Sequence, residues 1–221
     1  MTLVAVGDSI VHAEDSWAAW LARTMGADLS RVSANGARTD DVLAQLPLLA
    51  GERYAVACLS IGTNDVLFDW DAERYGERLG RIVAALGEVS DRVVAATVSL
   101  SLAGFPGGGT GIRRRAEEAN AAIAASGATV IVGDDLHGPR LLQADRVHPT
   151  QQGQLLLADR AAAALGVVPP PSSLAQPSAG ADRWTYHRVA AGQAPRHAVK
   201  RALGRPMYRD PRGDQGSAAG D

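Results

Sequence analysis

Short apolar runs alternate with longer amphipathic segments along the first three quarters of the chain. The apolar runs end at glycine or polar residues and predict five strands, of which the second has the weakest apolar pattern. These cover Leu3–Val6, Leu29–Ser33, Tyr54–Ile61, Arg92–Leu100 and Thr129–Val132. The segments between and after them carry apolar residues at helical spacing. They predict helices over Ser16–Met25, from Thr39 onward, over Asp71–Val89, over Ile112–Ser126, and from Pro149 to about Leu165.

Two of these helices have polar residues suited to the N-cap position. Asp15 is the expected cap of the first helix, and Thr39 is the expected cap before the acidic pair Asp40-Asp41. A side-chain oxygen at this position satisfies a backbone N–H of the first helical turn, and acidic residues there face the positive end of the helix dipole.

Alternation of strands and helices predicts an α/β protein, with a five-stranded parallel sheet covered on both faces in a three-layer α/β/α sandwich. Such sheets bind ligands outside the carboxyl ends of their strands. Ser9, Asn64 and the glycine-rich loop Ala103–Gly111 all follow strand ends and should share one edge. We expect that loop to form a flexible rim over the site.

Charge divides the chain into two parts. Residues 1–166 carry 14 Arg against 20 Asp and Glu, whereas residues 167–221 carry 7 Arg and Lys200 against 4 Asp, with 7 of the 11 prolines. We therefore expect one domain over 1–166, followed by a basic, Pro-rich extension over 167–221. The extension is expected to be partly disordered or a docked helix, with Ser172–Asp182 as a linker. It is a candidate for homo-oligomer or surface contact.

Overall composition excludes several classes of protein. A formal net charge of −2 gives no general attraction to nucleic acid, and Cys58, the single cysteine, excludes an internal disulfide framework and a Cys-based zinc site. No run of 18 apolar residues predicts a transmembrane segment. The first residues read as a strand rather than as a signal peptide, so a cytoplasmic location is expected.

Four short blocks carry the candidate chemistry. Three follow the first three strands in turn, and the fourth precedes the last helix. They are Gly7-Asp8-Ser9-Ile10, Ala34-Asn35-Gly36-Ala37-Arg38-Thr39, Gly62-Thr63-Asn64-Asp65 and Asp145-Arg146-Val147-His148-Pro149. Each block alone is a weak signal, because serine and asparagine after strands are usually turn or capping residues. The presence of all four blocks in this order is a specific signal.

In identity, order and approximate spacing these blocks resemble the SGNH hydrolases, also called the GDSL esterase/lipase superfamily. The resemblance covers residues 3 to about 165. It implies a flavodoxin-like fold, with Ser9 as nucleophile, His148 as base and Asp145 as the partner that orients it. It also implies that Ser9, Gly36 and Asn64 form an oxyanion hole, and that no metal or cofactor is needed.

The residue types suit these roles physically. A serine hydroxyl is a weak nucleophile near neutral pH and needs a base such as His148 within hydrogen-bond reach. A carboxylate on the other ring nitrogen, here from Asp145, fixes the tautomer and stabilises the imidazolium. Backbone N–H groups of Ser9 and Gly36 and the amide of Asn64 are suitable donors to an oxyanion.

The predicted function is hydrolysis of a small-molecule ester, with a short acyl or acetyl group, through an acyl-Ser9 intermediate. Acyltransferase and thioesterase activity use the same machinery and stay open, as does a catalytically silent binding module. The α/β-hydrolase fold is excluded because its Gly-x-Ser-x-Gly elbow has Val11 in place of the second glycine, and because too few residues precede Ser9.

Two further features have competing interpretations. Asp8 is expected to accept hydrogen bonds from nearby backbone N–H groups rather than to act as a catalytic acid. Phe68 and Trp70 follow Asn64 closely and are candidates either for the wall of an acyl pocket or for core packing.

Overall fold

Five parallel strands form the central sheet of the computed structural model, which describes residues 1–105 and 111–175. The strands are β1 (Thr2–Gly7), β2 (Asp28–Ser33), β3 (Val56–Ser60), β4 (Val93–Ala96) and β5 (Thr129–Ile131). Their order across the sheet is β2-β1-β3-β4-β5, and every neighbouring pair is parallel. The predicted α/β class with a five-stranded parallel sheet is confirmed.

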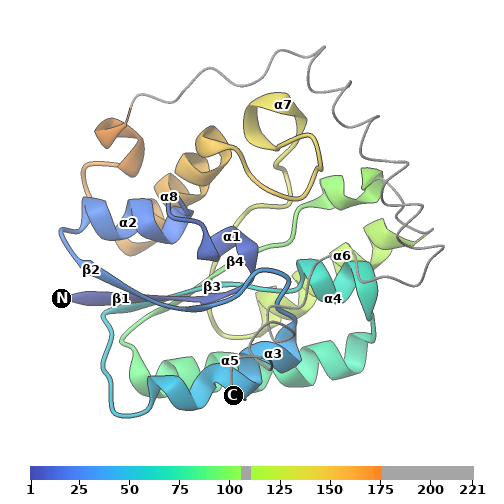
Figure 1. Cartoon of the computed structure of the whole chain (residues 1–221), viewed down its shortest axis with the longest axis horizontal. Coiled ribbons are helices and arrows are strands. Elements are labelled where there is room, and N and C mark those ends of the chain that lie inside the picture. Colours follow the sequence, from blue (N-terminus) through green and yellow to red (C-terminus); the bar gives the residue numbers. More distant parts are fainter. Residues whose placement is uncertain (106–110, 176–221) are drawn as a thin grey trace, which may run out of the picture.

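Helices cover both faces of the sheet (Figure 1). One face packs against α1 (Ser9–His12), α2 (Trp17–Thr24) and α8 (Gln151–Leu165). The other packs against α3 (Thr39–Gln45), α4 (Thr63–Phe68), α5 (Ala72–Val89) and α6 (Ile112–Ala125). The short helix α7 (Gly138–Leu141) precedes α8, and 3₁₀ turns cover Leu46–Leu49, Leu100–Gly104 and Pro171–Leu174.

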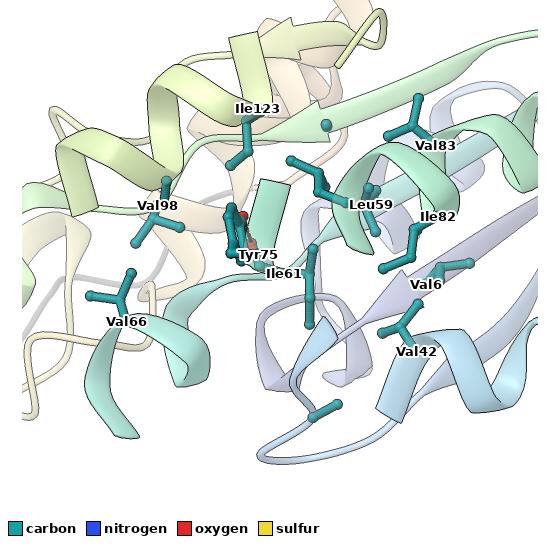
Figure 2. Packing of buried hydrophobic residues seen from close by; sticks show 14 of the residues in the cluster. Val6, Val42, Leu59, Ile61, Val66, Tyr75, Ile82, Val83, Val98 and Ile123 are labelled. Atoms are coloured by element: carbon teal, nitrogen blue, oxygen red, sulfur yellow. Dashed lines mark hydrogen bonds between the residues drawn. The ribbon is translucent and has the colours of Figure 1, made fainter. Parts of the chain in front are cut away.

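Burial along the strands follows from this layering. Every residue of β3 and all but the first of β1 are buried, as expected for strands covered on both faces. β2 lies at an edge and is half exposed, which explains its weak sequence signal. Figure 2 shows the core on the α5 side, where Tyr75 lies among aliphatic side chains and its hydroxyl donates to the carbonyl oxygen of Ile61, 3.4 Å away.

The strand order fixes where a ligand is expected to bind. From β1 the chain crosses to β2 on one side, and the later strands are then added on the other side of β1. Such a reversal opens a crevice at the carboxyl ends of β1 and β3. Ser9 follows β1 and Asn64 follows β3, so both flank this switch point.

Both predicted helix caps were wrong by one residue. Ser16, not Asp15, caps α2, and its hydroxyl accepts a hydrogen bond from Ala19 N–H. Asp15 instead forms an exposed ion pair with Arg23. Arg38 occupies the N-cap position of α3, so Thr39 is the first helical residue. The Thr39 hydroxyl is thereby free to donate to a carboxylate on another element, described below.

The fourth strand is shorter than predicted. Regular pairing of β4 ends at Ala96, whereas the apolar pattern runs on to Leu100. The amide side chain of Asn120 in α6 bonds to both backbone groups of Val98, at 2.7 and 2.9 Å. These bonds replace a strand partner, and the chain then turns into the 3₁₀ segment Leu100–Gly104.

The first residues of the predicted C-terminal extension pack on α2 and α8. Pro171 is buried, the Pro171–Leu174 turn contacts α2 and α8, and Ser172 N–H donates to Asp159 at 2.8 Å. The rest of the extension, 176–221, and part of the glycine-rich loop, 106–110, lie outside the described residues, and so do the predictions made for them. Within residues 1–105 and 111–175, no helix is long and apolar enough to cross a membrane.

Candidate active site

The candidate nucleophile, Ser9, is placed by a tight turn at the end of β1. Gly7 adopts a φ of +131°, and a Cβ at this position would lie 1.9 Å from the carbonyl oxygen of Ser60 in β3. Glycine is therefore required both by the backbone angle and by the close approach. Asp8 follows as the N-cap of α1, with its carboxylate accepting from Ile10 N–H at 3.0 Å. Ser9 is the first residue of α1 and is half-buried.

Ser9, His148 and Asp145 form a continuous hydrogen-bonded chain. Ser9 Oγ lies 2.8 Å from His148 Nε2, and His148 Nδ1 lies 2.6 Å from Asp145 Oδ2. The nucleophile candidate and its base are 139 residues apart in sequence. The structure thus brings together three residues that the sequence predicted as one unit, in the order that general-base activation of a serine requires.

The loop before α8 holds Asp145 and His148 in this arrangement. Asp145 Oδ1 accepts from the backbone N–H groups of Val147 and His148, each at 3.0 Å, while its other oxygen contacts the ring. Gln143 N–H donates to the carbonyl oxygen of His148 at 2.8 Å and closes the loop. The carboxylate therefore has little freedom to rotate away from the imidazole.

Charge and burial act in opposite directions on this pair. Burial raises the pKa of Asp145, but the bond and positive charge of His148, with the two backbone N–H groups, outweigh it and hold that pKa below its usual range. Burial lowers the pKa of His148, but the Asp145 carboxylate and the charge of Asp8 bring it above its usual range. Asp145 is thus kept ionised beside the imidazole.

Three predicted oxyanion donors lie on segments that follow β1, β2 and β3. The Ser9 N–H opens α1 and has no acceptor within that helix. Gly36, at a φ of +79°, has an N–H with no acceptor among residues 1–105 and 111–175. One Asn64 amide hydrogen bonds the carbonyl oxygen of Ala37 at 3.1 Å, which fixes the amide and leaves its second hydrogen available.

A buried contact between α3 and α4 supports these donors, and no sequence pattern predicted it. Asp65 accepts from Thr39 Oγ1 at 2.7 Å and from Thr39 N–H at 3.1 Å. Because Asp65 adjoins Asn64 and Thr39 lies three residues after Gly36, these bonds tie the two donor segments together. Burial raises the pKa of Asp65, and the bonds from Thr39 oppose that rise.

Gln154 of α8 is a second positioning residue that the sequence did not reveal. Its amide oxygen accepts from Trp17 N–H at 2.8 Å, and its amide nitrogen donates to the Ile10 carbonyl oxygen at 3.1 Å. It therefore links α8 to both α1 and α2 beside Ser9. A glutamine inside a helical apolar pattern has no signal that distinguishes it from a surface residue.

Asp8 is the most unusual carboxylate of the site. It is fully buried, and its Oδ2 has no hydrogen-bond partner among the described residues. Burial raises its pKa to about 7, the Ile10 N–H and the charge of His148 oppose the rise, and the charge of Asp65 adds to it. The prediction that Asp8 accepts from nearby backbone is confirmed by the Ile10 contact.

The aromatic residues after Asn64 differ in their surroundings. Trp70 packs against Tyr75 with ring centroids 5.2 Å apart, and its indole N–H donates to Glu118 at 2.9 Å. Trp70 is partly buried and packs against the core cluster on the α5 side of the sheet. Phe68 is 42% exposed at the end of α4.

Solved structures with the same fold include several esterases. A member of the lipolytic protein G-D-S-L family from Veillonella parvula superposes with a TM-score of 0.61 at 19% identity, covering 76% of this chain and 98% of that one. The psychrotrophic esterase EstA from Pseudoalteromonas sp. gives 0.57 at 18%, covering 75% and 96%. The acetylxylan esterase Axe2 from Geobacillus stearothermophilus gives 0.57 at 17%, covering 75% and 94%. At these identities the likeness establishes the fold.

The family follows from the sequence itself. Residues 5–156 match the GDSL-like Lipase/Acylhydrolase family, and the chain belongs to that family. The matched range contains all four blocks described above. No curated protein matches the chain. Membership agrees with the resemblance seen in the blocks and places the protein, at family level, among the hydrolases that act on esters.

Proposed function

We propose that this protein is a serine hydrolase that cleaves carboxylic esters through an acyl-Ser9 intermediate, with His148 as general base and acid and Asp145 as its orienting carboxylate. The observation that carries the proposal is the unbroken chain from Ser9 Oγ to His148 at 2.8 Å and from His148 to Asp145 at 2.6 Å. Family membership and the esterases among the structural neighbours support the reaction class.

The first half of the reaction acylates Ser9. His148 Nε2 takes the Ser9 hydroxyl proton as Oγ bonds to the ester carbonyl carbon, and the carbonyl oxygen becomes an oxyanion. The N–H groups of Ser9 and Gly36 and the free amide hydrogen of Asn64 donate to that oxygen. As the tetrahedral intermediate collapses, the carbon–oxygen bond to the alcohol breaks, and His148 gives its proton to the departing alkoxide.

The second half returns the enzyme to its starting state. His148 removes a proton from water, the resulting hydroxide attacks the acyl carbon, and the intermediate collapses with Ser9 Oγ as the leaving group. His148 protonates Ser9, and the carboxylic acid is released. An alcohol in place of water gives acyl transfer, and a thioester in place of the ester gives thioesterase activity, so the acceptor and the leaving group decide between these activities.

Short acyl or acetyl esters are the proposed substrates. Among the structural neighbours, Axe2 is named an acetylxylan esterase. The test is hydrolysis of a p-nitrophenyl ester series from acetate to palmitate by the wild type and by Ser9→Ala. Wild-type rates that peak at short chains and vanish in Ser9→Ala support the proposal. A rate in Ser9→Ala equal to the wild type would overturn it.

We further propose that residues 1–166 form the catalytic domain and that 167–221 form an extension of it. Docking of the Pro171–Leu174 turn on α2 and α8 suggests a cut after Ala175 rather than nearer the domain. A chain ending at Ala175 is expected to keep its esterase activity. Loss of activity would show that the extension contributes to the site, and a change in oligomer size would assign it to self-association.

A further inference from the structure

A cavity of about 490 Å³ lies outside the carboxyl ends of β4 and β5. Its walls come from four segments: the 3₁₀ turn Leu100–Gly104, the chain after β5, α7, and the first turn of α6. Arg146, from the loop that carries Asp145 and His148, completes it. The cavity therefore adjoins the candidate catalytic loop, and nothing in the reaction scheme above uses it.

Arg146 combines an unusual backbone angle with a close contact to the cavity wall. Its φ of +61° is the one left-handed angle at a non-glycine position among the described residues, and such strain persists where the surroundings impose it. Gly104 provides the second feature: a Cβ there would lie 1.9 Å from Arg146 Nη1. The guanidinium thus rests on the bare Cα of Gly104, and a side chain at position 104 would displace it.

The charged groups that line the cavity differ in the partners that the described residues give them. Arg113 bonds Glu117 at 3.0 Å, and Asp135 forms two 2.7 Å bonds with Arg160. Within residues 1–105 and 111–175, the guanidinium of Arg146 forms no ion pair or hydrogen bond. The Asp134 carboxylate accepts no hydrogen bond in the same residues, but its negative charge acts on Arg160 and contributes to the raised pKa of that guanidinium. His137, the remaining titratable group of the lining, bonds the backbone oxygen of Asp135 through Nδ1.

These two groups define the chemistry of a matching ligand. A guanidinium offers paired N–H donors to a carboxylate or a phosphate, and a free carboxylate accepts from hydroxyl groups. A polyol that carries an anionic group satisfies both, whereas a plain acyl chain satisfies neither. Arg146 lies between Asp145 and His148 in the chain, so the cavity and the candidate catalytic residues share one loop.

We infer that this cavity binds the alcohol half of the ester, and that this half is a polyol bearing a phosphate or carboxylate, with its anionic group on Arg146 and a hydroxyl on Asp134. This inference rests on the proposed function, because it names the substrate class of the same site. The reaction is unchanged: the anionic polyol is the leaving group that His148 protonates.

The kinetic test compares 1-acetylglycerol 3-phosphate with 1-acetylglycerol. The wild type is expected to favour the phosphate by about tenfold or more in kcat/KM, the factor given by one charge-assisted contact. Arg146→Gly relieves the left-handed strain and should fold, yet it should bring the ratio close to one. Arg146→Lys should keep part of the preference. In Arg140→Gln, which removes an exposed charge of α7 that does not line the cavity, the ratio should stay at the wild-type value.

The binding test does not depend on turnover. Calorimetric titration of the Ser9→Ala protein with glycerol 3-phosphate and with glycerate is expected to show binding that disappears in Ser9→Ala/Arg146→Gly. The ligand that binds more tightly shows whether the anionic group is a phosphate or a carboxylate. A third substrate, mono-p-nitrophenyl glutarate, carries its charge on the acyl half. If the protein prefers this substrate over an uncharged p-nitrophenyl ester, and if that preference is lost in Arg146→Gly, the assignment to the alcohol half is overturned.

The remaining outcomes separate the two proposals. One outcome is that neutral esters are hydrolysed and that the kcat/KM values for 1-acetylglycerol 3-phosphate and 1-acetylglycerol are nearly equal in both the wild type and Arg146→Gly. This would overturn the cavity inference, while the proposal of a serine hydrolase would stand. Arg146-dependent binding of glycerol 3-phosphate by a protein that hydrolyses no ester would overturn the hydrolase and leave the anion site. Absence of both binding and hydrolysis would overturn both.

Discussion

Gly7 of β1 and Ser60 of β3 lie so close that a Cβ on Gly7 would be 1.9 Å from the Ser60 carbonyl oxygen. The same oxygen accepts from Asp8 N–H at 2.9 Å, one residue before Ser9. Approach of the two strands at their carboxyl ends therefore sets the direction in which α1 leaves the sheet, and with it the position of the candidate nucleophile.

Gly7→Ala should be strongly destabilising. The new methyl group meets a backbone atom that cannot move aside, at a φ of +131° that alanine avoids, and the expected loss is about 3 kcal/mol or more. Thermal unfolding should show a fall in Tm of roughly 6 °C or more. The matched control is Gly76→Ala in α5, where no atom of the described residues outside the surrounding helix backbone lies within 4 Å of the new Cβ, and the Tm should hold or rise. Equal melting of wild type and Gly7→Ala would contradict the tight turn.

The pH dependence of activity should follow His148. Protonated His148 cannot accept the Ser9 proton, so kcat/KM should fall as the pH drops through the His148 pKa, with a midpoint above the usual 6.5. Asp145→Asn removes the carboxylate that raises this pKa, and its loss should also reduce kcat by about 10⁴-fold.

The shift can be measured without activity by NMR titration of the His148 ring in both proteins. The midpoint should lie lower in Asp145→Asn than in the wild type. An unchanged midpoint would mean that the Asp145 carboxylate does not control the protonation of the base.

Asn64→Ala should lower kcat by about 100- to 1000-fold with a much smaller change in KM, because an oxyanion donor acts mainly in the transition state. Steady-state kinetics on one ester gives both values. Thr39→Val is the control: it removes the hydroxyl that donates to Asp65, costs stability, and keeps the Asn64 amide, so kcat should fall less than tenfold. Similar kcat losses in the two variants would assign Asn64 a structural role.

Asp8→Asn should change stability in a pH-dependent way. Burial raises the Asp8 pKa from 3.8 to about 7, so the folded state holds its proton more tightly than the unfolded chain does. That contribution is fully present below about pH 4 and is lost as the pH rises through 7. Relative to the wild type, Asp8→Asn should therefore become more stable as the pH increases, by about 1 kcal/mol or more between pH 5 and pH 8.

Urea unfolding at the two pH values measures this difference. Asp15→Asn serves as control, because it removes an exposed ion-pair partner and should alter stability by less than about 1 kcal/mol at either pH. A stability difference between Asp8→Asn and wild type that is the same at pH 5 and pH 8 would show that Asp8 does not titrate in this range.

Periodicity was sufficient to predict the main elements. Apolar runs predicted the inner strands well, because a strand covered on both faces, such as β3, must be continuously hydrophobic. The half-exposed edge strand β2 was also predicted, from a weaker apolar pattern. Helix ends were less predictable: Asp15 and Ser16 are both good caps, and which one is used depends on how α2 packs. The short helices α1, α4 and α7 were missed because four to six residues show no helical period.

Residues of the candidate site were predictable where a block carried them and not elsewhere. Ser9, Asp145 and His148 were predicted as one unit by type and order, and the structure places them in one hydrogen-bonded chain. Gln154 and the Thr39–Asp65 pair form hydrogen bonds between elements that are far apart in sequence, and no local sequence pattern predicts such contacts. The left-handed angle of Arg146 is likewise set by the folded loop rather than by the residue's own preference.

The most direct test of the account is labelling with a fluorophosphonate probe, followed by intact-mass and peptide analysis. The probe forms a covalent bond with a serine that a neighbouring base activates. One adduct per chain on Ser9, absent in Ser9→Ala and strongly slowed in His148→Ala, is the result predicted here. Wild-type protein that is left unlabelled, or labelled at another serine, would contradict the assignment of Ser9 as the nucleophile.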